Sequence, residues 1–328
     1  MLTAYDVTET GPKKIAENPD AAALSKAHWI DIKDPTHEED RAAERFLGVP
    51  VPTAEEASEI EFSSRFYVDG GAVGMTATIL SGVDLNEPAL TPFTFVLHGD
   101  KLATVRYADF VAFRQFMARS SHPESGCDDP IGIVFAITEA IIDRLADVVE
   151  KTGAEIDKLN GEIFRRVTPG GRRRERRLEA ILTQIGNQND IVSKARESIA
   201  SLERMIQFIT AGRPGPLARI DKDEEPRLKL MQRDIRSLSD QTSYLSNKTT
   251  FLLDATLGLI SVQQNEVIRI LTVAATILLP PTLIGTIYGM NFTFMPELDW
   301  PWGYPLALGL MAVAALIPFV YLKRRGWF

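Results

Sequence analysis

Two long apolar segments lie close together in the last sixty or so residues, whereas the preceding part of the chain mixes apolar positions with charged and polar ones. These segments are Leu271–Tyr288 and Tyr304–Leu322, and neither contains Asp, Glu, Lys or Arg. Each has about the length that an α-helix needs to cross the hydrocarbon region of a bilayer. The pattern predicts a charged, water-exposed body that ends in a two-helix membrane anchor.

Short runs of β-branched and aromatic residues, separated by turn residues, predict a mixed α/β arrangement at the start of the chain. Ala27–Ile32 is an expected strand. A helix is expected to open at Thr36 and to stop at Gly48. Strands are expected within Arg65–Ser81, and Phe93–Arg106 fits a hairpin. The fold class expected here is α+β, a mixed sheet with helices.

From residue 128 onwards the apolar positions recur every three or four residues, which is the period of a helix. Helices are expected over Ile131–Arg166 and from about Arg172 to Ala211. A third helix of about 65 residues starts near Glu224, and at 1.5 Å per residue it is roughly 100 Å long. Its apolar stripe needs partners, either the helices over 128–166 and 172–211 or other copies of the chain. The stripe comprises Leu228, Met231, Ile235, Leu238, Leu245, Phe251, Leu252, Leu259 and Val262.

These patterns divide the chain into consecutive parts. We expect an α/β cytoplasmic domain over 1–127, a cytoplasmic helical hairpin over 128–223 and the stalk part of the long helix over 224–270. A first transmembrane helix over 271–290, a periplasmic loop over 291–303, a second transmembrane helix over 304–322 and a basic cytoplasmic tail over 323–328 complete the chain.

The charges next to the apolar segments predict the orientation in the membrane. Arg269 precedes the first segment and Lys323–Arg325 follows the second, whereas the connector carries Glu297 and Asp299 and has no Lys or Arg. The positive-inside rule therefore places both termini in the cytoplasm. The first residues lack the pattern of a signal peptide, which agrees with a cytoplasmic body.

Composition narrows the function classes further. The formal net charge of −8 argues against nucleic acid as the main partner. The single cysteine, Cys127, fits a reducing compartment, and the four scattered histidines form no cluster with zinc-site spacing. Neither a nucleophile–base arrangement nor a phosphate-binding loop is evident, so an enzyme is not expected and no organic cofactor is implied.

A polar stripe runs along the first membrane helix in steps of three and four residues, so its members share one face. Polar groups in hydrocarbon are costly unless they meet protein or water, and such a stripe fits the wall of a pore. Packing between helices fits it equally well. Because one copy cannot surround an ion, a pore requires a homo-oligomer. The stripe comprises Asn265, Ile268, Thr272, Ala275, Leu279, Thr282 and Thr286.

The segments around the connector resemble the CorA family of divalent-cation channels. Tyr288-Gly289-Met290-Asn291 directly follows the first membrane helix, and Met295-Pro296-Glu297-Leu298 comes next. Gln264–Arg269 before the helix, Pro280–Leu283 within it and Trp302–Pro305 after the loop are also similar to that family. The resemblance is specific over about residues 224–328 and looser before them.

The resemblance implies a funnel-shaped homopentamer in which the first membrane helix lines the pore and the second forms an outer ring. It implies that Gly289, Met290 and Asn291 form the outer mouth, where Asn291 meets the ion. Glu297 and Asp299 could raise the cation concentration there or be solvated loop acids. The pore-lining positions implied are Asn265, Ile268, Leu271, Thr272, Leu279, Thr282 and Thr286, with Ile268, Leu271 and Leu279 as the hydrophobic constriction.

The transported ion implied is Mg²⁺, with Co²⁺ and Ni²⁺ as further substrates, taken up at the inner membrane and driven by the membrane potential. Intracellular Mg²⁺ would also close the channel by binding between neighbouring copies, and Asp84, Asp234 and Asp240 are the acids considered for that role. Zn²⁺ transport in the same superfamily and a membrane-anchored scaffold or sensor without transport are the alternatives.

Overall fold

The structure is a computed structural model that describes residues 1–8, 10–59, 61–120, 126–164, 171–212, 214–220, 224–291, 295–296 and 300–327, without the side chains of residues 62 and 171–176. The chain forms two compact units. Unit 1 contains Met1–Val167 and Ile181–Leu253, and unit 2 contains Thr168–Ala180 and Asp254–Phe328.

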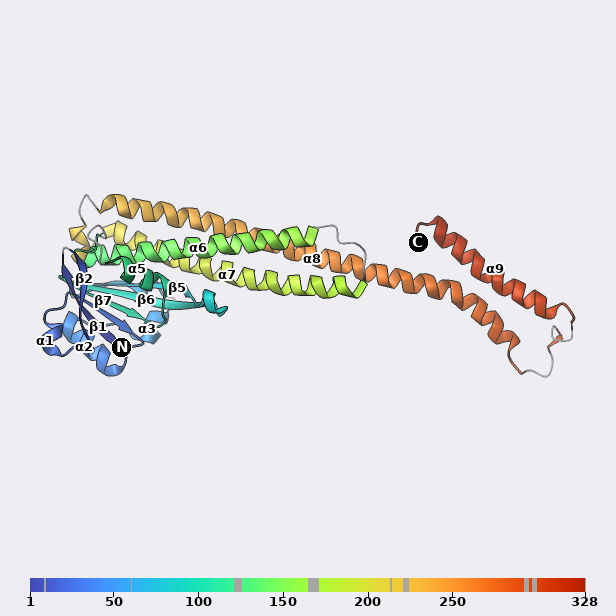
Figure 1. Ribbon diagram of the computed structural model, residues 1–328, viewed down its shortest axis with the longest axis horizontal. Helices are drawn as coiled ribbons and strands as arrows, with labels where there is room; N and C mark the ends of the chain where they lie inside the picture. The colour runs from blue at the N-terminus through green and yellow to red at the C-terminus, as the bar shows by residue number, and fades with distance from the viewer. Residues whose placement is uncertain are drawn as a thin grey trace. The chain divides into compact units, whose positions relative to one another are not determined.

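Unit 1 contains a mixed sheet with the strand order β2-β1-β3-β7-β6-β5-β4 (Figure 1). The pair β3–β7 is parallel, and the other neighbouring pairs are antiparallel. The mixed sheet predicted from the sequence is therefore confirmed. Its strands are β1 Leu2–Thr8, β2 Gly11–Glu17, β3 Trp29–Lys33, β4 Phe66–Asp69, β5 Ala72–Ser81, β6 Ala89–His98 and β7 Lys101–Arg106.

Short helices surround the sheet, and three long helices follow it. The short ones are α1 Ala21–Leu24, α2 His37–Leu47, α3 Ala54–Ser58, α4 Phe62–Arg65 and α5 Val111–Arg119, with 3₁₀ turns at Val83–Leu85 and Gly215–Arg219. The long ones are α6 Pro130–Phe164, α7 Gly171–Gly212 and α8 Glu225–Tyr288, and α9 Gly303–Arg324 ends the chain. The long helix and the two C-terminal apolar helices are thereby confirmed.

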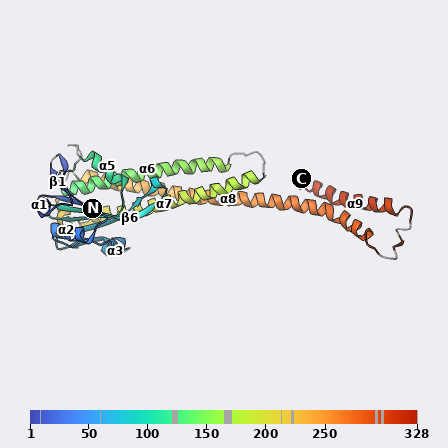
Figure 2. The same ribbon diagram turned by 60° about the horizontal axis from the view of Figure 1, so that its bottom comes forward.

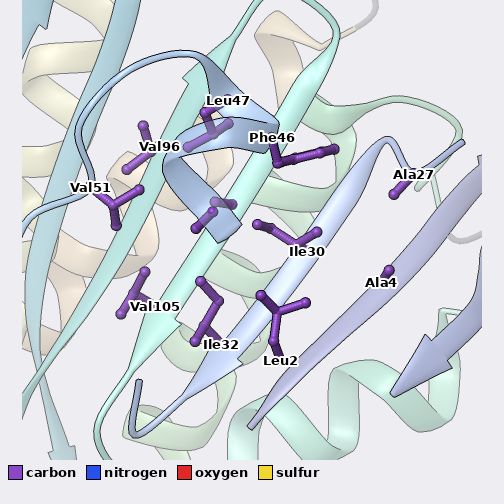
Figure 3. Packing of buried hydrophobic residues seen from close by; sticks show 12 residues of the cluster. Leu2, Ala4, Ala27, Ile30, Ile32, Phe46, Leu47, Val51, Val96 and Val105 are labelled. Atoms are coloured by element: carbon purple, nitrogen blue, oxygen red, sulfur yellow. The ribbon is translucent and has the colours of Figure 1, made fainter. Parts of the chain in front are cut away.

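Helix α2 begins and ends at the residues that the sequence indicates. Thr36 and Glu39 form a capping box, and Gly48 ends the helix with a φ of 77°, where a side chain would be strained. The buried face of α2, including Phe46 and Leu47, packs on one face of the sheet against a cluster from β1, β3, β6 and β7 (Figure 3). This cluster gives that face of the sheet its hydrophobic core.

The opposite face of the sheet holds a buried ion pair. The Arg106 guanidinium donates from Nη2 to Asp31 Oδ2 at 2.9 Å, and Thr104 Oγ1 donates to Asp31 Oδ1 at 2.8 Å. The guanidinium also lies 4.3 Å from the ring centroid of Phe113 in α5. Burial raises the pKa of Asp31, and Arg106 and Thr104 oppose that shift by stabilising the charged form.

Helix α7 covers the part of strand β5 that extends past its short partner β4. Strand β4 pairs only with residues from Ala72 to Met75. Farther along β5, the N–H of Thr78 donates to Ser201 Oγ at 2.8 Å, and the N–H of Leu80 donates to Ser198 Oγ at 3.2 Å. Two hydroxyls one turn apart on α7 therefore satisfy edge groups that would otherwise lack partners.

Within unit 1, α6, α7 and the first part of α8 lie side by side in both views (Figures 1 and 2). The buried positions of α8 recur at three- and four-residue spacing, as the sequence predicts: Leu228, Met231, Ile235, Leu245 and Leu252. Two positions of the predicted stripe, Phe251 and Val262, have no partner helix that buries them within the described part of one chain, since they are 58% and 65% exposed. Phe251 neighbours the buried Leu252, and adjacent helical positions point about 100° apart.

We expect Arg106→Met to destabilise unit 1 by about 3–5 kcal/mol, because it leaves the buried Asp31 carboxylate without its partner. The loss should shrink as the pH falls, since a carboxyl whose folded-state pKa is raised favours folding in its protonated form. The measurement is thermal unfolding of the purified full-length protein at several pH values. Arg114→Met, which breaks the exposed pair with Asp109, should cost about 1 kcal/mol at most, and equal losses would contradict the prediction.

Candidate functional site

The polar stripe lies on the surface of the single chain. Every predicted pore-lining residue of α8 is exposed: Asn265, Ile268, Leu271, Thr272, Leu279, Thr282 and Thr286. In unit 2, α9 contacts another side of α8, because a Cβ at Gly285 would lie 3.1 Å from Met311 Cε. Within the described part of the chain, α9 therefore leaves the stripe uncovered.

The stripe threonines use their hydroxyl hydrogens within the helix. Thr272, Thr282 and Thr286 each donate from Oγ1 to the carbonyl oxygen four residues earlier, at 2.8, 2.7 and 2.8 Å. A hydroxyl oxygen whose hydrogen is engaged still accepts hydrogen bonds through its lone pairs. These side chains can therefore accept hydrogen bonds from water molecules, including those around a hydrated cation, at positions about one to three turns apart.

Two consecutive prolines lie inside α8 without ending it. Pro280 and Pro281 are within the helix, which continues to Tyr288. Each proline removes one backbone donor, which leaves the carbonyl groups of Thr276 and Ile277 without their usual helical partners. The ribbon of α8 bends in its dark orange C-terminal part (Figure 1). Prolines are the commonest cause of such bends.

The first two residues after α8 extend its last turn. The N–H of Gly289 donates to the Gly285 carbonyl at 3.0 Å, and the N–H of Met290 donates to the Ile287 carbonyl at 3.3 Å. A Cβ at Gly289 would lie only 3.1 Å from the Gly285 carbonyl oxygen. Glycine is therefore favoured here because of this close contact and not because of its φ, which is not positive. Asn291 follows with an exposed side chain. The two predicted loop acids, Glu297 and Asp299, lie outside the described residues.

The three acids predicted for regulation do not come together in one chain. Asp84 accepts two hydrogen bonds from Arg144 Nη2 in α6, at 2.7 and 2.6 Å, in an ion pair that the sequence did not reveal. Asp234 and Asp240 are exposed on α8. Among the residues that the structure describes, no group of three or more His, Cys, Asp or Glu side chains is arranged to hold a metal ion.

Asp234 nevertheless lies near other acids. Burial raises the pKa of Asp143 in α6, Arg119 opposes that shift, and the negative charges of Glu139, Asp147 and Asp234 add to it. Acidic side chains from α6 and α8 therefore share one region of unit 1. The positive partner of Glu139 is Arg227, whose Nη2 lies 2.8 Å from Oε2.

Two helices among the described residues, α8 and α9, are long and apolar enough to cross a membrane. Their apolar windows are almost wholly exposed within the chain. A core helix of a water-soluble protein would be buried instead. This exposure indicates contact with lipid or with other copies.

The family profile described as "CorA-like Mg2+ transporter protein" matches residues 25–324. The chain belongs to this CorA-like family. It is 32% identical to the magnesium transport protein CorA of Pasteurella multocida over 327 residues, and 31% identical to that of Haemophilus influenzae strain Rd over 327 residues. All of this chain and all of each relative are covered. The family membership predicted from the motifs is confirmed, and with it a membrane protein.

The fold agrees with a solved CorA structure. The complete structure of the CorA magnesium transporter from Methanocaldococcus jannaschii matches with a TM-score of 0.74 at 19% identity, covering 100% of this chain and 99% of that one. At this identity the likeness supports the fold alone. Sheet, long helix and two apolar C-terminal helices are thus the CorA-like architecture.

Thr282→Val should slow Mg²⁺ uptake several-fold, because it removes an exposed acceptor oxygen while keeping the size and branching of the side chain. Thr250→Val is the matched control, since the exposed Thr250 also donates to its own helix, at 3.1 Å to the Ser246 carbonyl, but precedes the stripe. The measurement is the initial rate of Mg²⁺ entry into proteoliposomes. Equal rates for the two variants would contradict the assignment of the stripe as the path of the ion.

Proposed function

We propose that this CorA-like protein is a Mg²⁺ uptake channel in which the stripe of α8 lines the path of the ion. The observation that carries the proposal is the set of exposed threonines whose oxygens remain free to accept hydrogen bonds. Its full-length relatives, named magnesium transport proteins, support Mg²⁺ as the substrate. Neither a zinc transporter nor a scaffold without transport gains support from these relatives, and no enzymatic activity is proposed.

The assembly proposed is a homopentamer. One copy presents the stripe on one side only, so several copies are needed to enclose a path. Around a central axis, each stripe residue becomes a ring of identical groups. Asn265, Thr272 and Thr282 then supply rings of oxygens, and Ile268, Leu271 and Leu279 supply the apolar constriction between them.

Neutral oxygens suit this substrate. Mg²⁺ gives up its water reluctantly, so side chains that hydrogen-bond to its hydration shell guide it without dehydration. Conduction also requires that each site in the membrane-spanning part hold the ion weakly enough to release it, which carboxylate rings at that depth would oppose. Asn291, exposed directly after α8, is placed to contact the hydrated ion first. Co²⁺ and Ni²⁺ are proposed as further substrates.

We place the protein in the inner membrane with both termini in the cytoplasm, because Arg269 and Lys323–Arg325 flank the two helices on one side. The membrane potential then favours entry by about 2.3 kcal/mol per charge per 100 mV, or about 4.6 kcal/mol for a divalent cation. Uptake needs no coupled chemistry.

Feedback by intracellular Mg²⁺ is the regulatory part of the proposal. Mg²⁺ would bind between neighbouring copies through acids such as Asp84, Asp234 and Asp240, and would stabilise the closed state in proportion to its differential affinity. At Asp84 the ion has to compete with the Arg144 guanidinium, which already neutralises that carboxylate.

Asn291→Ala should abolish potential-driven Mg²⁺ uptake into proteoliposomes, because it removes the amide that first contacts the hydrated ion. The control is Gln241→Ala, which truncates an exposed amide of α8 off the stripe and should transport like wild type. A wild-type protein that carries Zn²⁺ but not Mg²⁺, or no divalent cation at all, would refute the proposed function.

Arg144→Gln should lower the Mg²⁺ concentration that protects the purified protein from proteolysis, by up to about fivefold, the equivalent of about 1 kcal/mol for a partly exposed ion pair. Asp84→Asn should raise that concentration. Arg114→Gln, at a comparable surface pair with Asp109, is the control and should change nothing. No shift in either Asp84→Asn or Arg144→Gln would remove Asp84 from the regulatory site.

A further inference from the structure

One flank of α8, about 100° from its buried stripe, carries large exposed residues at seven-residue spacing. Leu230, Tyr244 and Phe251 are 55%, 57% and 58% exposed, with Ser237 completing the repeat. Single exposed apolar residues are ordinary on a protein surface. Two exposed aromatic side chains one heptad apart on a long helix are less ordinary, because this spacing keeps both of them on one face. We call Tyr244 and Phe251 the aromatic pair.

The aromatic pair has the same heptad phase as the polar stripe. Counting in sevens along the sequence from Phe251 leads through Gly258 to Asn265, Thr272, Leu279 and Thr286. α8 is one helix from Glu225 to Tyr288. A repeat of seven kept over this length turns the same face toward a common axis when copies of the helix coil around one another with a left-handed twist. The phase therefore points to a second copy of this chain as the neighbour of this face.

The polar residues near the aromatic pair indicate whether copies of α8 pack directly on each other or face a water-filled space. Asn247 lies between Tyr244 and Phe251 on the same face, Asp240 precedes them, and both are exposed. A dry seam between helices would bury this amide and this carboxylate without partners, which is costly. A water-filled space between copies leaves them hydrated. The mixed face therefore fits the wall of an aqueous passage better than a packed helix–helix contact.

The local contacts hold the aromatic rings at the surface. Phe251 stacks on Phe164 of α6, with ring centroids 6.2 Å apart and an interplanar angle of 21°. Phe164 is itself 55% exposed, so the stack does not bury Phe251. Lys248 Nζ lies 5.5 Å from the ring centroid of Tyr244. The rings are therefore supported by their own chain and still face outward.

We infer that Tyr244 and Phe251 form two successive aromatic collars around the water-filled passage of the stalk, which limit the rate of Mg²⁺ flow. This inference rests on the proposed channel function. The Phe251 ring narrows the passage and offers no lone-pair acceptor to the water molecules of a hydrated cation, whereas the Tyr244 hydroxyl and the Asn247 amide do. The collars therefore act on rate, and the neutral oxygens of the stripe act on recognition.

The first test is the rate of Mg²⁺ entry into proteoliposomes. Phe251→Ala should raise the rate several-fold, because it opens the collar without touching the stripe. Phe164→Ala is the matched control, since it removes the same aromatic stack from the other side and should leave the rate unchanged. An unchanged rate in Phe251→Ala, or an equal increase in both variants, would overturn the inference.

The second test uses thiol modification. In a Cys127→Ser background that transports like wild type, Phe251→Cys treated with a bulky cationic thiol reagent should lose Mg²⁺ uptake, because several copies of the adduct fill the passage. Thr250→Cys is exposed one residue away on the neighbouring side of α8, and its modification should leave uptake intact. Equal block at both positions, or none at Phe251→Cys after complete labelling, would overturn the inference.

The two proposals fail in different ways. Absence of wild-type Mg²⁺ uptake in correctly assembled protein refutes the proposed function and the collars with it. Normal wild-type uptake, loss of uptake in Asn291→Ala and no effect at Phe251 would keep the channel and refute the collars alone. A flexible bismaleimide that links subunits at Phe251→Cys but not at Thr250→Cys would support the placement of this face toward the axis without any measurement of flux.

Discussion

The structure depends on the ladder of backbone hydrogen bonds in α8, which runs from Glu225 to Tyr288 and loses two bonds at Pro280 and Pro281. In hydrocarbon, a backbone group without a partner costs several kcal/mol, so a helix is one of the few forms in which a chain can cross. The ladder also fixes which side chains share a face, and a single helix from Glu225 to Tyr288 carries its side-chain pattern from a soluble environment into a membrane. The prolines at 280 and 281 are tolerated because the bond loss is confined to two carbonyl groups.

In unit 1, the placement of α8 follows from contacts that begin at the sheet. Ser198 and Ser201 attach α7 to the edge of β5, and the apolar face of α8 packs within the three-helix arrangement that contains α7. The buried pair of Asp31 and Arg106 joins the central strands β3 and β7, and the Arg106 guanidinium packs on Phe113 of α5. The sheet holds α7, and α7 and α6 bury one face of α8. The face of α8 that stays exposed is therefore set by these contacts.

Local sequence rules predicted the elements that depend on neighbouring residues. Thr36 and Gly48 define α2 by capping and by a positive φ, and these are properties of a few adjacent residues. The first two strands were not foreseen. β2 has few apolar residues and is stabilised by pairing with β1, which in turn pairs with β3. Arg144 is a similar case, since nothing near it in sequence indicates Asp84, sixty residues earlier, as its partner.

Helical periodicity placed the repeated threonines on one face of an apolar segment, and that face is exposed in the chain. Its role as the wall of a pore stays a prediction. Periodicity could not tell which side of α8 is buried. It placed Phe251 in the buried stripe, since 251 and 252 both fit a three- or four-residue step, and only the packing of α8 in unit 1 decides between them.

Charge is distributed along the chain in a way that separates two tasks. The segment from Leu271 to Tyr288 carries hydroxyl and carbonyl oxygens and no carboxylate, whereas the acids considered for regulation, including Asp84 and Asp234, lie in unit 1. A carboxylate binds Mg²⁺ strongly, so the fraction of such sites that are occupied follows the Mg²⁺ concentration. A neutral oxygen binds the ion weakly and releases it quickly. A passage that must turn over ions needs the second kind, and a sensor of those ions needs the first. In the proposed channel, the neutral oxygens of the membrane-spanning helix and the regulatory acids lie in different units. A substitution that changes the affinity for Mg²⁺ at one of these sites therefore leaves the ligands of the other unchanged.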